Sequence, residues 1–208
     1  MATASRGRDS RKTRSAAPGG ARERIDATAY DLFCRHGARA VGIDTIIARS
    51  GIAKMTLYHH YRSKDELIAS FLRRRWDVFA TAWAKEVERR GRTPEQRLLA
   101  VFDALDAWFR EPDFCGCPVL RILLEEKRSR GPVAAGIAQY LGGLKTFLAG
   151  LAAEARLRHP GDVAAQWLVL IKGAIIAAYA GDRRAAWRAK DMAALLLDSA
   201  KPRARRRR

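Results

Sequence analysis

Apolar side chains recur at helical spacing along most of this chain, and no long segment alternates apolar and polar residues as a strand would. The pattern therefore predicts an all-α protein of about nine helices. Glycine and proline mark most of the breaks between them, as at Gly37, Gly91 and Pro160. The predicted helices cover residues 21–36, a short stretch between the segment 38–43 and a turn at 50–52, then 53–61, 64–90, 95–110, 118–128, 131–157, 162–180 and 183–199.

Two short helices joined by a tight turn are predicted within residues 45–67. Gly51 can take a positive φ in the turn without a penalty. In the second short helix Leu57 and Tyr61 are spaced to face a core, which leaves several hydrogen-bond donors outward. Residues 63–66 (Ser-Lys-Asp-Glu) match a capping box that opens the next helix. This is the pattern of a helix-turn-helix, whose second helix enters the major groove of DNA.

The run Gly51-Ile-Ala-Lys-Met-Thr-Leu-Tyr-His-His-Tyr-Arg-Ser-Lys-Asp-Glu-Leu67 resembles the DNA-binding signature of TetR-type (TetR/AcrR) bacterial transcription regulators. Further segments are similar to the ligand-domain pattern of one TetR subgroup: Asp113-Phe-Cys-Gly-Cys-Pro118, Glu125, Gly131-Pro132-Val133 and Gly173-Ala174. The resemblance covers residues 22–198. It implies an N-terminal three-helix helix-turn-helix domain and a C-terminal helical domain for ligand binding and dimerisation.

The chain is expected to divide into a disordered basic arm (1–20), a helix-turn-helix DNA-binding domain (21–66), a ligand-binding and dimerisation domain (67–199) and a basic tail (200–208). Residues 1–20 carry +4 and residues 201–208 carry +6 of the net charge of +18. Basic tails bind phosphate without sequence preference. A nonspecific, nucleoid-type DNA binder is therefore an alternative function.

The resemblance places DNA contacts on six residues: Lys54, Thr56 and His59 for base readout, and Tyr58, His60 and Lys64 for the DNA backbone. A purely structural helix pair is the alternative, but packing alone does not require this run of outward donors. The two adjacent histidines point about a third of a turn apart on a helix, so they are poorly placed to share a metal ion. We expect no metal and no cofactor. The sequence has no catalytic constellation, which argues against an enzyme.

A ligand cavity enclosed by the middle helices is also implied by the resemblance. Its candidate lining residues are aromatic and apolar side chains of those helices and one carboxylate: Phe79, Trp83, Phe102, Trp108, Leu120, Leu124, Glu125, Tyr140, Phe147 and Trp167. Any single aromatic ring could instead fill the core, and Glu125 could equally lie on the surface. Residues 121–124 (Arg-Ile-Leu-Leu) are bulkier than in the subgroup and would narrow the cavity. Lys172 stands where the subgroup tends to carry an acidic residue.

The last two predicted helices are apolar around most of their circumference, so something must cover them. A partner chain is the expected cover, and the family implies a four-helix dimer interface there; burial within one chain is the alternative. The apolar stretch 164–180 contains Gln166 and Lys172 and is short for a bilayer span. No secretory signal follows the basic N-terminus. We expect a cytoplasmic protein without a membrane partner.

Three cysteines, Cys34, Cys115 and Cys117, are too few for a disulfide scaffold. The Cys115-Gly-Cys117 spacing raises the alternative of a thiol- or metal-sensing regulator. Two thiolates need further ligands to close a tetrahedral site, so a structural loop with Cys117 as a small buried side chain is favoured.

The favoured function is a ligand-responsive transcriptional regulator, specifically a repressor. It would bind double-stranded, pseudo-palindromic operator DNA as a homodimer and leave it when a small molecule, expected to be apolar, binds the cavity.

Overall fold

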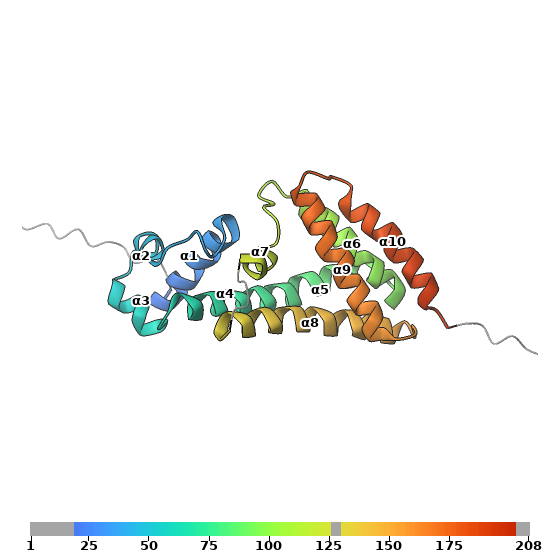
Figure 1. The fold of residues 1–208 in the computed structure, drawn as a ribbon, viewed down its shortest axis with the longest axis horizontal. Helices are drawn as coiled ribbons and strands as arrows, with labels where there is room; N and C mark the ends of the chain where they lie inside the picture. The colour runs from blue at the N-terminus through green and yellow to red at the C-terminus, as the bar shows by residue number, and fades with distance from the viewer. Residues whose placement is uncertain (1–18, 126–129, 203–208) are drawn as a thin grey trace, which may run out of the picture.

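The computed structural model describes residues 19–125 and 130–202, which form helices joined by short connections (Figure 1). No strand occurs within these residues, and the helices number nine when α4, η1 and α5 are taken as one continuous rod. The predicted all-α class is therefore confirmed. Most of the predicted basic arm (1–20) and basic tail (200–208) lies outside the described residues.

A small head at one end of the molecule consists of the first three helices, which pack on the start of the fourth (Figure 1). These four helices are α1 (Ala21–His36), α2 (Ile43–Ser50), α3 (Lys54–His60) and α4 (Lys64–Val78). The head buries one apolar side chain or more from each helix, including Ile25, Phe33, Ile46, Leu57 and Leu67. Burial of such side chains is the main force that holds short helices together.

The remaining helices form the body. They are η1, a π-helical turn (Phe79–Trp83), α5 (Ala84–Arg90), α6 (Pro94–Phe109), α7 (Pro118–Glu125), α8 (Pro132–Glu154), α9 (Pro160–Tyr179) and α10 (Ala185–Ala200). In Figure 1, α4 and α5 run from the head along α8, and α9 and α10 lie at the far end. The predicted helix 118–128 corresponds to α7, and its last predicted residues, 126–128, lie outside the described residues.

Helix starts follow the capping chemistry of the sequence. The Ser63 hydroxyl accepts a hydrogen bond from the Glu66 N–H at 3.2 Å, while the Glu66 carboxylate accepts one from the Arg62 N–H at 2.8 Å. Thr93 and Gln96 form a full capping box at the start of α6, in addition to the predicted one at Ser63. Gly42 begins α2 without a side-chain cap.

The long helix predicted over residues 64–90 exists, but a π-turn interrupts it at η1. The Thr81 hydroxyl in this turn donates to the Asp77 carbonyl at 2.8 Å. A π-turn inserts one extra residue into the helix and rotates the side chains that follow it. Phe79 and Trp83, at its two ends, stack with ring centroids 4.5 Å apart.

Two glycines on one face of α8 allow α4 to approach it closely. A Cβ atom at Gly136 would lie 2.9 Å from Leu72 Cδ1, and one at Gly143 would lie 2.5 Å from the Trp76 ring. Because real Cβ atoms do not come so close, any larger residue would push the two helices apart.

Two apolar cores fill the molecule. The core of the head continues into the body, since it also contains Val119 and Ile122 of α7 and Ile137 of α8. The second core centres on Trp167, whose indole N–H donates to the Leu98 carbonyl at 2.9 Å. The domain boundary near residues 66–67 remains a prediction, because the packing of the head crosses it.

Candidate DNA-binding surface and effector cavity

Helix α3 presents one face to the head and the other outward. Leu57 and the following Tyr61 are buried, as their i, i+4 spacing predicts. Five of the six predicted DNA contacts lie on α3, and His60 is its last residue. The side chains of Lys54, Tyr58 and His59 are exposed, whereas those of Thr56 and His60 are half-buried. The structure therefore brings these five residues together on one short helix.

Lys64 lies at the start of α4, where its ammonium group donates to the Arg39 carbonyl at 3.2 Å. It thus ties α4 to the connection between α1 and α2. Met55 was not among the predicted contacts, yet its side chain is 79% exposed on the outward face of α3. An exposed apolar side chain at such a position suits contact with a thymine methyl group. Its position directly after Lys54 was the signal that could have identified it.

The turn between α2 and α3 is held from α1. Gly51 adopts φ 64° and ψ 31°, the left-handed conformation expected for it. The Arg24 guanidinium donates to the Ser50 carbonyl at 3.1 Å and to the Gly51 carbonyl at 2.8 Å. The Tyr61 hydroxyl donates to the Asp26 carboxylate, which fixes the end of α3 against α1. These bonds give the outward face of α3 a defined orientation.

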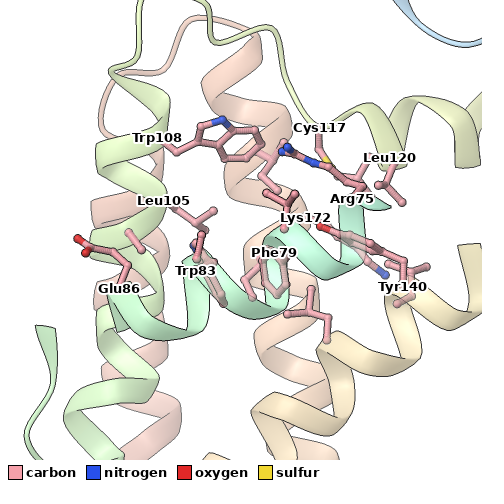
Figure 2. A pocket seen from close by; sticks show the side chains of 18 of the residues that line it. Arg75, Phe79, Trp83, Glu86, Leu105, Trp108, Cys117, Leu120, Tyr140 and Lys172 are labelled. Atoms are coloured by element: carbon pink, nitrogen blue, oxygen red, sulfur yellow. The ribbon is translucent and has the colours of Figure 1, made fainter. Parts of the chain in front are cut away.

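A cavity of about 440 Å³ lies in the body, between the rod α4–η1–α5 and helices α6 to α9 (Figure 2). Five of the predicted lining residues line it: Phe79, Trp83, Trp108, Leu120 and Tyr140. Rings of Phe79 and Tyr140 lie 5.8 Å apart between centroids and form one wall. The volume is in the usual range for small-molecule sites.

The structure places the other five predicted residues outside this cavity. Phe102 and Trp167 are fully buried in the second core, where their rings lie 6.3 Å apart between centroids. Phe147 packs behind Trp83. Leu124 is 69% exposed, and the Glu125 carboxylate turns to the head, where it accepts a hydrogen bond from the Arg39 N–H at 3.4 Å. Helical spacing alone does not distinguish a core position from a cavity wall.

Charged residues of the cavity wall were not predicted as ligand contacts. Arg75, Glu86, Glu111 and Lys172 all line the cavity. Arg75 and Lys172 each interrupt an otherwise apolar helical stripe, and this interruption is the signal that could have identified them.

Arg75 connects the cavity to the head. Its Nη1 donates to the Tyr30 hydroxyl of α1 at 2.8 Å, and its buried Nε has no hydrogen-bond partner within the described residues. Burial by itself would lower the pKa of the guanidinium, but Tyr30, Tyr140 and Cys34 together raise it. The guanidinium therefore stays charged inside the protein. Burial also raises the pKa of the Tyr140 phenol.

Glu86, on the other side of the cavity in Figure 2, already has partners for its carboxylate. Hydrogen bonds from Arg89 at 2.8 Å and from Arg90 hold the pKa of its carboxyl down to about 2. Its negative charge is thus matched by two cations of its own helix.

The cysteines lie where the head meets the body. The Cys115 thiol donates to the Cys34 carbonyl at 3.1 Å. Burial raises the pKa of the Cys34 thiol to about 11 and also raises that of Cys117. Since the thiolate is the reactive form, these two thiols are poorly activated. In residues 19–125 and 130–202 no three His, Cys, Asp or Glu side chains cluster as metal ligands would.

Helices α9 and α10 carry large apolar side chains on their outer faces: Val169, Ile176, Tyr179, Trp187, Met192 and Leu195. Val169 is 70% and Leu195 73% exposed. As far as the structure describes the chain, α9 is the one helix long and apolar enough to cross a bilayer, a test that core helices of globular proteins also pass. Its inner face, with Trp167 and Ile171, packs into the second core.

Comparison with known proteins explains this combination of head, cavity and apolar helix pair. The family model of the bacterial regulatory proteins, tetR family, matches residues 25–71, which include the whole helix-turn-helix. A crystal structure of a putative TetR transcriptional regulator from Streptomyces avermitilis has a TM-score of 0.77 and 28% identity, covering 88% of this chain and 98% of that one. The chain belongs to the TetR family.

Other TetR proteins extend the comparison. SCO4454, a TetR-family transcriptional regulator from Streptomyces coelicolor, has the same fold, with a TM-score of 0.77 and 23% identity over 88% of this chain and 96% of that one. The HTH-type transcriptional activator FasR of Mycolicibacterium smegmatis is 34% identical over 76 residues. That match covers 36% of this chain and about a third (34%) of the length of FasR.

As a TetR protein the chain is a DNA-binding transcription regulator and not an enzyme. The head is the part that carries the family match, so the helix-turn-helix predicted from the sequence is confirmed. The individual base, phosphate and effector contacts remain predictions.

Proposed function

We propose that this TetR protein is a repressor that binds a pseudo-palindromic operator as a homodimer and leaves it when a small molecule enters the cavity. The observation that carries the proposal is the continuous rod α4–η1–α5, which starts on the head and forms a wall of the cavity. A ligand that favours one position of this rod also favours one position of the head.

In this proposal Lys54, Thr56 and His59 contact base edges, and Tyr58, His60 and Lys64 contact the DNA backbone. Exposure of Lys54 and His59 supports their role, because both can reach a groove without any rearrangement of the head. Half-buried Thr56 lies one turn before His60 on the same helix and can reach only a base that approaches closely.

The homodimer would form through the outer faces of α9 and α10. Their exposed apolar side chains follow helical spacing, as Val169 and Ile176 do on α9, so each helix offers a continuous stripe. Contiguous apolar patches of this kind mark interaction surfaces. Pairing of two stripes around a two-fold axis would place two copies of α3 on one face of a duplex. The proposal also places the protein in the cytoplasm, where it has access to DNA.

The test is selection of bound duplexes from a random pool by the purified full-length protein at moderate salt. We expect an inverted repeat whose half-sites lie whole helical turns apart. Absence of any sequence preference would contradict the proposal and favour the nucleoid-type alternative.

A control separates the tails from the head. Deletion of residues 1–20 and 201–208 should weaken binding to every duplex alike and reduce its salt dependence, while the preference for the selected repeat remains. A reporter gene behind the selected repeat then distinguishes repression from activation, the role named for FasR.

A further inference from the structure

The charges of the cavity wall do not balance. Glu86 is held by Arg89 and Arg90, whereas in the described part of the chain no carboxylate lies within 4.0 Å of the cationic groups of Arg75 or Lys172. Glu111, the second carboxylate of the wall, pairs with no cation of the described residues either, so the wall holds two unpaired cations and one unpaired carboxylate. The unmatched charge of the wall is therefore positive on the side of Arg75. A charge in an apolar surrounding is stable only when an opposite charge or hydrogen-bond acceptors approach it.

Arg75 has a buried hydrogen-bond donor without a partner among the described residues. Its Nη1 is used by Tyr30, but its buried Nε donates to no described atom. Buried donors in proteins nearly always have a partner, so an orphaned one marks a place where an acceptor is missing. Figure 2 shows Arg75 below Cys117, on the same side of the cavity as Tyr140. An acceptor bound at this place would meet a guanidinium that is already fixed in position.

Apart from its charged residues, the wall is apolar and aromatic. Phe79 and Trp83 stack on each other, and Leu105, Trp108 and Ile171 complete the lining around them. The π-turn η1 holds both stacked rings on the cavity side of the rod. Such a surface binds a flat or branched hydrocarbon body well, but it offers nothing to a strongly polar one.

We propose that the effector is an amphipathic organic acid, with a carboxylate on the Arg75 Nε and an aromatic or branched apolar body against Phe79, Trp83 and Trp108. Lys172 adds a second positive charge to the same wall. The inference rests on the proposed function, because it takes the cavity as the effector site. It changes the expected effector from an apolar molecule to an acid.

Three matched pairs of probes test this: phenylacetate, 2-naphthylacetate and 1-pyrenebutyrate, each against its neutral amide, which is similar in shape. Binding to the full-length protein is measured by titration calorimetry at pH 7.5. We expect at least one acid to bind about tenfold or more tightly than its amide, the difference typical of a hydrogen bond to a charged group. Equal affinity within every pair, or binding of no acid, would overturn the inference.

Variants locate the charge. Arg75→Gln should reduce the preference for the acid about tenfold and change the affinity for the amide little. Because Arg75→Gln also removes the bond to Tyr30, Lys172→Gln is a second variant that leaves that bond intact, and it should reduce the preference in the same direction. Arg73→Gln, an exposed neighbour on α4, is the matched control and should bind both probes as the wild type does. An undiminished preference in Arg75→Gln and Lys172→Gln would overturn the assignment.

Operator release distinguishes this inference from the proposed function. If an acid binds with the expected preference but releases no operator, the acid site stands and the ligand-released repressor fails. If the amide binds and releases operator as well as the acid does, the repressor stands and the acid site fails.

Discussion

Arg75 touches both halves of the molecule through a single side chain. It lines the cavity and at the same time donates to the Tyr30 hydroxyl of α1. The Tyr30 ring itself packs on Phe71, and the Arg74 guanidinium lies over it at 5.3 Å. A shift of Arg75 toward a bound carboxylate would therefore pull on, or release, a residue of the DNA-binding head.

Tyr30→Phe tests this connection, since it removes the hydroxyl and keeps the ring. We expect 2-naphthylacetate to bind the variant nearly as well as the wild type. The change in operator affinity that 2-naphthylacetate causes should be smaller in the variant than in the wild type by about 1 kcal/mol, or roughly fivefold. The measurement is operator affinity by fluorescence anisotropy with and without the acid.

Arg74→Gln is the control for that experiment. It removes the cation over the Tyr30 ring and leaves the bond from Arg75 in place. The acid should change the operator affinity of Arg74→Gln as much as that of the wild type. If the acid has this full effect in Tyr30→Phe as well, the bond from Arg75 to Tyr30 does not link the cavity to operator binding.

At the scale of single elements, the start of α2 lacks a side-chain cap that the backbone there could accommodate. Gly42 has φ −78° and ψ 155°, which suit any residue, and a Cβ added there would meet only Thr45 Oγ1 at 3.9 Å. A serine at this position can cap the helix and restrict the unfolded chain.

Gly42→Ser should therefore stabilise the protein by about 0.5–1 kcal/mol. For a chain of this length that raises the melting temperature by about 1–4 °C, measured by differential scanning calorimetry. Gly131→Ser, at the start of α8, is the matched control with the opposite sign, because Gly131 has φ 85°. A lower melting temperature for Gly42→Ser would contradict this explanation.

Helices were predictable because their physical signals are local. Apolar spacing, the glycine at Gly37 and the proline at Pro94 depend on neighbours within a few residues, and the observed boundaries agree closely with the predicted ones. The π-turn was not predictable. Residues 79–83 read as ordinary helix, and no local signal in them marks the extra residue of the turn.

The cavity, too, could be predicted from the sequence only in part. Trp83 and Trp108 line it, while Trp167 fills the core, although all three are aromatic residues at helical spacing. Which ring faces empty space depends on how far apart the helices stand, and contacts such as that of Gly143 with Trp76 set that separation. The charged wall residue Arg75 was visible in the sequence as an interruption of an apolar stripe, but its meaning required the position of Tyr30.

For the whole molecule, the proposed operator binding requires two heads held at a fixed separation. One copy presents a short α3 that reads only a few base pairs, and the apolar faces of α9 and α10 would join it to a second copy. Leu195→Asp places a charge in the middle of that face and should separate the copies, because burial of an unpaired carboxylate is strongly unfavourable. Ala138→Asp, on an exposed position of α8, should leave them joined.

Hydroxyl-radical footprinting on the selected duplex tests this arrangement most directly. We expect two protected stretches on one face of the DNA, a whole number of helical turns apart, for the wild type and for Ala138→Asp. In Leu195→Asp both stretches should disappear together at the same protein concentration. One protected stretch in the wild type, or two unchanged stretches in Leu195→Asp, would contradict this arrangement.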